Sequence, residues 1–272
     1  MEIMENNRKN RGIMHQKINT KDIHAHPIAQ REFNQKHGDY LAKNWDWEKY
    51  KPIDVSFRDG KYWNIDGQHR KYGAVKRNGG KDCVLMCRVH YGMTPLDEAM
   101  FFLQQGDGIT KITISDKLRV MYKIGDEQTM ELVRGAVMAG WDIDNFNTKK
   151  ARGRIIAHST LLKVYKALPY EQYVDMLKTV RAAWDGDPDS VCREMLLGMG
   201  LFYKTYCGKF LSSDLIKNMK KISPLLIVRD GRAIGNAHTS TGMDLASGRC
   251  YARCILREYN NGRKTKRLDD EL

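Results

Sequence analysis

Five consecutive residues, Asp66-Gly67-Gln68-His69-Arg70, place anion-binding side chains and a glycine where a predicted strand meets a predicted helix. The N-terminus of a helix presents unpaired backbone N–H groups and the positive end of the helix dipole. In this arrangement Asp66 would cap the helix and Gly67 would let a ligand approach the backbone. The amides of Gln68, His69 and Arg70 would then point at a phosphate, and the last two side chains would add charge-assisted hydrogen bonds. The segment therefore predicts a phosphate site.

A purely structural interpretation fits the same five residues. Asp caps helices and Gly forms turns in many proteins, whether or not a ligand is present. The residue types alone do not decide between the two interpretations.

The elements around this step are well marked in the sequence. Residues 53–57 and 62–65 alternate apolar and polar side chains and are joined through Asp59-Gly60, which predicts a β-hairpin. Residues 69–77 follow as a helix, and residues 82–92 predict a further strand. Thr94 and Pro95, with acidic residues directly after them, mark the start of another helix.

From Ser115 onward the apolar residues recur with helical periodicity. The sequence therefore predicts an α/β (α+β) chain, with a small mixed sheet in the N-terminal domain and an all-helical C-terminal region. The expected parts are a disordered basic arm (1–14), the α/β domain (15–112), a helical domain (113–262) and a charged tail (263–272).

The order of motifs resembles the ParB/sulfiredoxin-like superfamily, in its phage and plasmid branch with the Asp-Gly-Gln-His-Arg motif. The resemblance rests on "IHAHPIAQREF", "VSFRDGKYWNI", "DGQHR" and "PLDEAMFFLQQGDG", in that order between about Lys17 and Gly108. It implies a sheet flanked by helices that holds a nucleotide or phosphate group at the Asp66-to-Arg70 step. The implied cofactors are a nucleoside triphosphate, ATP or CTP, with Mg²⁺ as a candidate companion.

The same resemblance places Gln30 and Arg31 across the cleft from the phosphates. Glu32 beside them is the candidate catalytic acid or base, although an ordinary exposed glutamate in a first helical turn fits as well. Gln68 stands where sulfiredoxins carry their reactive cysteine, which excludes sulfinic acid repair. Partition proteins have Gly-Glu-Arg-Arg at this step, so the CTP-gated closure of those proteins is in doubt here.

The chain has 272 residues and a formal net charge of +13, which favours acidic or nucleic acid partners. Both ends are basic. Arginines at helical spacing near the C-terminus form a stripe that predicts DNA contact, while the solvent-exposed face of an amphipathic helix explains it equally. The DNA-binding candidates are Arg249, Arg253, Arg257 and Arg263.

The leading hypothesis is a ParB-like phage or plasmid protein that binds a nucleotide and engages DNA. An interaction or inhibitor protein on a vestigial ParB-like fold, binding a host protein, is an alternative. A nuclease, nucleotide hydrolase or phosphotransferase of the superfamily is a third hypothesis. The sequence shows no membrane-spanning stretch, and its scattered cysteines predict a reducing, intracellular compartment. The resemblance implies that this compartment is the cytoplasm of a bacterial host cell. Cys250 and Cys254, one helical turn apart, could hold a metal with His238, but no metal site is predicted. A homodimer is a candidate state.

Overall fold

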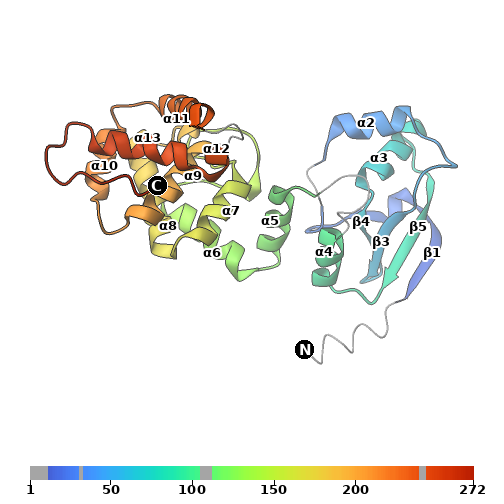
Figure 1. Ribbon diagram of the computed structural model, residues 1–272. Helices are drawn as coiled ribbons and strands as arrows, with labels where there is room; N and C mark the ends of the chain where they lie inside the picture. The colour runs from blue at the N-terminus through green and yellow to red at the C-terminus, as the bar shows by residue number, and fades with distance from the viewer. Residues whose placement is uncertain (1–11, 31–32, 105–111, 239–242) are drawn as a thin grey trace. The chain divides into compact units, whose positions relative to one another are not determined.

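The computed structural model describes residues 12–30, 33–104, 112–238 and 243–272 (Figure 1). The chain divides into two compact units, Met1–Gly125 and Asp126–Leu272. The predicted fold class is confirmed, because a five-stranded mixed sheet near the N-terminus is followed by a helical region.

The sheet of the first unit has the strand order β1-β5-β3-β4-β2. β3 runs parallel to β5 and β2 runs parallel to β4, while the other two pairings are antiparallel. The predicted hairpin joins β3 to β4, and its turn residues Asp59 and Gly60 both have positive φ, at 55° and 72°. The strands are β1 (Ile13–Asn19), β2 (Ile23–Ala25), β3 (Ile53–Arg58), β4 (Lys61–Asp66) and β5 (Val84–Tyr91).

Helices cover both faces of this sheet, with α2 and α3 on one side and α4 on the other (Figure 1). Ile53 and Val55 of β3 pack with Ala74 of α3 in one core cluster. Asp54, between them in the strand, points to the opposite face because side chains alternate along a strand. The helices are α2 (Gln35–Lys43), α3 (Gln68–Arg77), α4 (Pro95–Gln104) and α5 (Ile114–Lys123), with a short 3₁₀ turn at Thr20–Asp22.

Helix α5 belongs to the first unit, although the expected boundary at 112/113 placed it in the helical domain. Val120 of α5 is fully buried beside Ile65 of β4 and Phe102 of α4 in the second core cluster. Burial of this apolar face explains why the chain divides after Gly125 and not before α5.

The second unit is built on α9, whose aromatic residues Phe202, Tyr203 and Tyr206 are buried. Helix α13 and helix α7 pack against it. The helices of this unit are α6 (Glu127–Met138), α7 (His158–Ala167), α8 (Tyr170–Trp184), α9 (Arg193–Tyr206), α10 (Ser212–Met219), α11 (Pro224–His238), α12 (Met243–Ser247) and α13 (Arg249–Asn260), with 3₁₀ turns at Asp144–Phe146 and Pro188–Val191.

The two ends of the chain differ from the expected arms where they can be described. Residues 1–11 lie outside the described residues, and Ile13 and Met14 belong to β1 and not to an arm. Residues 263–272 are attached to the second unit, since Tyr206 donates to the carbonyl of Asp269 (2.7 Å) and Lys209 pairs with Glu271 (2.6 Å). The charged tail is therefore held against the second unit.

Candidate functional site

The strand-to-helix step differs from its predicted capping. Gly67 is the N-cap of α3, with φ at 105°, and it makes no side-chain capping hydrogen bond. Asp66 was expected to cap the helix, but its carboxylate accepts from Nη2 of Arg70 at 2.5 Å. This prediction was wrong because the left-handed Gly67 takes the cap position, which leaves Asp66 one residue too early to cap.

The guanidinium of Arg70 is engaged within the chain. Its Nη1 donates to the carbonyls of Lys51 (2.8 Å) and Pro52 (2.7 Å), and its Nη2 pairs with Asp66. Arg70 therefore ties α3 to the segment that enters β3, and a phosphate would have to displace these acceptors to reach it.

His69 is directed toward α2. Its Nε2 accepts the backbone N–H of Asn34 at 3.0 Å, and its ring stacks on Phe33 with centroids 4.8 Å apart. His69 therefore joins the start of α2 to the start of α3, which is a structural role.

Two other predicted residues, Gln30 and Gln68, line a pocket of about 80 Å³ at the first turn of α3. The pocket lies beside the edge strand β2 and its neighbour β4. Ligand pockets for drug-sized molecules measure roughly 300–1,000 Å³, so this one encloses a group of phosphate size and not a whole nucleotide. The complete lining is Ile23, His24, Ala25, Gln30, Asn64, Gln68 and Lys71.

Lys71 is the cation of this pocket. Its half-buried ammonium donates to the carbonyl of Ile23 at 2.5 Å, and burial lowers the pKa of the amine. An ammonium has three N–H donors, and among the described residues Ile23 provides its one hydrogen-bond acceptor. Lys71 follows Gln68 by three residues and therefore lies on the same helical face. This spacing is visible in the sequence, although Lys71 was not among the predicted site residues.

A hydrogen bond to the sheet holds the side-chain amide of Gln30 in place. Nε2 of Gln30 donates to the carbonyl of Asn64 at 2.6 Å. Asn64 is 2% exposed, and its Oδ1 has no hydrogen-bond partner among the described residues. Arg31 and the catalytic candidate Glu32 lie outside the described residues.

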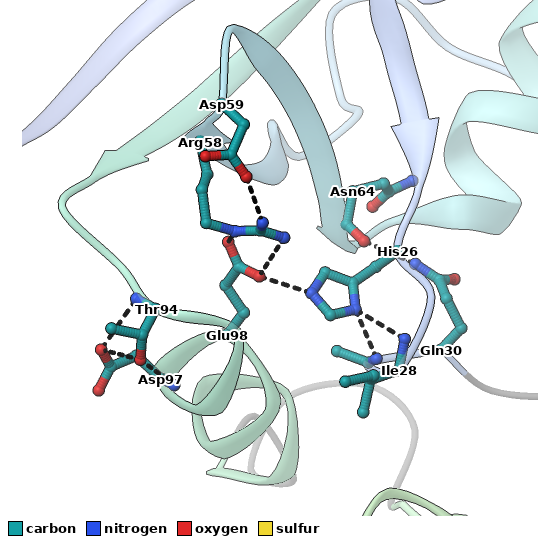
Figure 2. Close-up of polar contacts among 10 residues, drawn as sticks. His26, Ile28, Gln30, Arg58, Asp59, Asn64, Thr94, Asp97 and Glu98 are labelled. Carbon is teal, nitrogen blue, oxygen red and sulfur yellow. Dashed lines mark hydrogen bonds and ion pairs between the residues drawn. The ribbon is translucent and has the colours of Figure 1, made fainter. Parts of the chain in front are cut away.

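A buried polar network on the other face of the sheet supports Gln30. Figure 2 shows Glu98 of α4 between Arg58 and His26. Glu98 accepts from Nε2 of His26 at 2.7 Å and from Nε of Arg58 at 3.2 Å, and it is fully buried. Burial alone would raise the pKa of the Glu98 carboxyl, but its hydrogen bonds, with those from His26 and Arg58 among them, hold the pKa below its usual value.

Both ring nitrogens of His26 are engaged. Nδ1 accepts the backbone N–H groups of Ile28 (3.0 Å) and Ala29 (2.6 Å), so the proton of the neutral ring lies on Nε2 and is donated to Glu98. Neither nitrogen remains for a substrate, and His26 is therefore no general base. It fixes the turn that leads to Gln30 (Figure 2).

A second buried acid lies on the same face of the sheet. Asp54 accepts from Nε of Arg88 (2.5 Å) and pairs with Nε2 of His90 (2.7 Å). Burial alone would raise the pKa of Asp54, but its hydrogen bonds to His90 and Arg88 lower it below the ordinary value.

Acid is expected to destabilise the first unit through these two carboxyls. Because the pKa values of Asp54 and Glu98 are lowered by folding, their stabilisation is complete above the unfolded pKa of about 4 and is lost as the pH falls through the folded value. Urea unfolding between about pH 6 and pH 3 measures this loss. The free energy of unfolding of Asp54→Asn should depend less steeply on pH than that of the wild type. Equal pH dependence in the two proteins would contradict a lowered pKa of Asp54.

The arginine stripe on α13 is compensated by acidic residues. All four arginines named as DNA-binding candidates form ion pairs within the second unit. This arrangement supports the alternative of an amphipathic surface more than a free cationic stripe. The pairs include Arg249–Asp244 (3.6 Å), Arg253–Asp270 (3.3 Å), Arg257–Asp230 (2.9 Å) and Arg263–Asp214 (2.8 Å).

Residues 25–269 match DUF6551, a family of unknown function. The chain belongs to the DUF6551 family. The match to DUF6551 includes the lining of the pocket at α3 except Ile23 and His24, the buried network and nearly all of the helical unit. A comparison with curated proteins gave no match.

The described part of the chain contains neither a metal-binding group nor a membrane-spanning helix. No group of three or more His, Cys, Asp or Glu side chains there is arranged to hold a metal ion. No helix there combines the length and apolarity needed to cross a membrane.

Proposed function

We propose that the first unit binds the phosphate group of a nucleotide in the pocket at the first turn of α3. The observation that carries this proposal is Lys71, a half-buried ammonium with a single hydrogen-bond acceptor among the described residues, facing a pocket of phosphate size. Gln30 and Gln68 line the same space. A helix N-terminus beside them favours negative charge.

The size of the pocket determines how a nucleotide would bind. About 80 Å³ receives the phosphate alone, so the sugar and base would lie outside and contribute less to selectivity. The resemblance to ParB/sulfiredoxin-like proteins supports a nucleotide as the source of the phosphate, but the anchoring cation is Lys71 in place of the expected Arg70. The proposed activity is binding of the phosphate group.

Lys71→Met is expected to abolish the stabilisation of the protein by phosphate ligands. The thermal midpoint of the wild type should rise with inorganic phosphate, ATP, CTP or GTP, relative to sodium chloride at the same ionic strength. At a ligand concentration of about 100 times Kd the gain is roughly 2.7 kcal/mol. Methionine keeps the length and apolar contacts of Lys71 and removes the charge, so the unliganded variant should stay folded.

Arg77→Met is the matched control, because Arg77 is an exposed cation on the same helix. It should respond to phosphate as the wild type does. An equal rise of the midpoint in wild type and Lys71→Met, or no rise with any ligand in the wild type, would refute the proposed pocket.

A further inference from the structure

The loop between α6 and α7 carries four cations on a backbone that is fixed in place. Asp142 N donates to the carbonyl of Gly153 (2.7 Å), and Ile155 N donates back to Asp142 (3.0 Å). Gly153 N donates to the carbonyl of Gly186 (2.7 Å), which ties the loop to the turn after α8. The cations, presented at defined positions, are Lys149, Lys150, Arg152 and Arg154.

The same loop contains two adjacent residues in the left-handed conformation. Asn145 and Phe146 have φ values of 50° and 59°, and Phe146 is a bulky residue that rarely adopts them. Phe146 is 1% exposed, so packing holds it there. Strained non-glycine residues cluster at binding sites, where the surrounding structure maintains a geometry that the local chain disfavours.

Arg181, in the last turn of α8, faces this loop, and the described residues offer it no hydrogen-bond acceptor. Its guanidinium lies 5.5 Å from the ring centroid of Trp141, and Nη1 is buried with no partner in the described part of the chain. A Cβ on Gly186 would lie 1.6 Å from that nitrogen, and one on Gly153 would lie 4.0 Å from it. Two glycine backbones therefore pack against a guanidinium nitrogen that has no hydrogen-bond partner among the described residues.

The carboxylates nearby form ion pairs with the loop cations, and Asp185 also attracts Arg181 electrostatically. Lys150 pairs with Asp189 (2.6 Å), Arg154 pairs with Asp142 (3.0 Å), and Arg152 pairs with Asp185. In two of these pairs the cation is more than half exposed, at 53% for Lys150 and 68% for Arg152. Exposed pairs of this kind contribute little to stability, so an incoming polyanion can replace them.

We propose that Arg181 and the loop 149–154 form a binding site for phosphate oxyanions, of the kind that a nucleic acid backbone presents. A planar guanidinium matches two oxygens of a phosphate, and an unpaired one retains its hydrogen-bonding capacity for the ligand. The further cations follow one another along the loop, which suits successive phosphates better than a single ion. This site is independent of the pocket at Lys71 and lies in the other unit.

The test is binding of the full chain to fluorescein-labelled single-stranded and duplex DNA, followed by anisotropy over a series of salt concentrations. Arg181→Met should weaken binding by about tenfold and reduce the salt slope by about one. Lys178→Met, an exposed cation one turn earlier on α8, is the matched control and should change binding less than about twofold. A second experiment measures the thermal midpoint of the wild type and of both variants with and without inorganic phosphate.

Loss of DNA binding in Arg181→Met alone supports a nucleic acid ligand. A phosphate response lost in that variant, without DNA binding by the wild type, supports the same site with free phosphate as ligand. Equal effects of Arg181→Met and Lys178→Met, or no binding of either ligand by the wild type, would overturn the proposal. If Arg181→Met does not fold, Lys149→Met takes its place, and a loss no greater than that of Lys178→Met overturns the proposal as well.

Discussion

Replacing Glu98 with alanine is expected to lower the free energy of unfolding by about 3–5 kcal/mol, because it removes one partner of a buried ionic network. Glu98 is fully buried and accepts from both His26 and Arg58. Without it, the guanidinium of Arg58 loses its buried acceptor and the Nε2–H of His26 has none. Urea unfolding at neutral pH, followed by circular dichroism, measures the loss.

The neighbouring residue Asp97 provides the control. Its carboxylate accepts from the backbone N–H (3.0 Å) and hydroxyl (2.7 Å) of Thr94 in an exposed capping arrangement. Asp97→Ala should therefore cost only about 1 kcal/mol. If Glu98→Ala costs no more than this, the buried network contributes no special stability. Glu98→Gln, which keeps an acceptor for His26 but removes the charge, should fall between the two.

Gly67→Ala is expected to destabilise the first unit by roughly 2–5 kcal/mol, the sum of backbone strain and overpacking. The φ of Gly67 is 105°, a conformation that L side chains rarely adopt. A Cβ there would lie 2.1 Å from Cγ2 of Ile53, in the centre of the core cluster, and 3.1 Å from Nε of Arg70. Neither neighbour can move away freely, because Ile53 is fully buried and Arg70 is held by three oxygens.

Gly60→Ala separates the two contributions. Gly60 also has a positive φ, at 72°, but a Cβ there meets nothing within 4 Å. The free energy of unfolding of this variant should therefore fall only by the cost of the left-handed backbone, about 1–2 kcal/mol. Thermal unfolding of both variants provides the comparison, and equal losses would show that contact with Ile53 has no part in the requirement for glycine at position 67.

These expectations give Gly67 a different role from the one the sequence suggested. Ligand access was the predicted reason for a glycine beside the helix, but intramolecular packing already requires one. Arg70 also has a structural role within the chain, since its guanidinium donates to the carbonyls of Lys51 and Pro52. The strand, turn and helix were predicted correctly, and the capping role of Asp66 was not, because Gly67 is the N-cap.

Much of the fold follows from local patterns along the chain. The alternation in residues 53–57 and 62–65, with Asp59-Gly60 between them, specifies a hairpin because strand period and turn geometry are local properties. Helical periodicity after Ser115 likewise predicts the helical region, which the structure contains. The boundary between the two units does not follow from a local pattern, because it depends on whether the apolar face of α5 packs against the first unit.

The sequence by itself determined the elements, the fold class and the position of a helix N-terminus with polar residues around it. Only the tertiary structure decided which side chains meet there. Glu98 and His26 are 72 residues apart in sequence and 2.7 Å apart in space, and Lys71 lines the pocket while Arg70 donates to the carbonyls of Lys51 and Pro52. The physical reason is that hydrogen-bond partners and burial depend on contacts between distant segments, and no local pattern records those contacts.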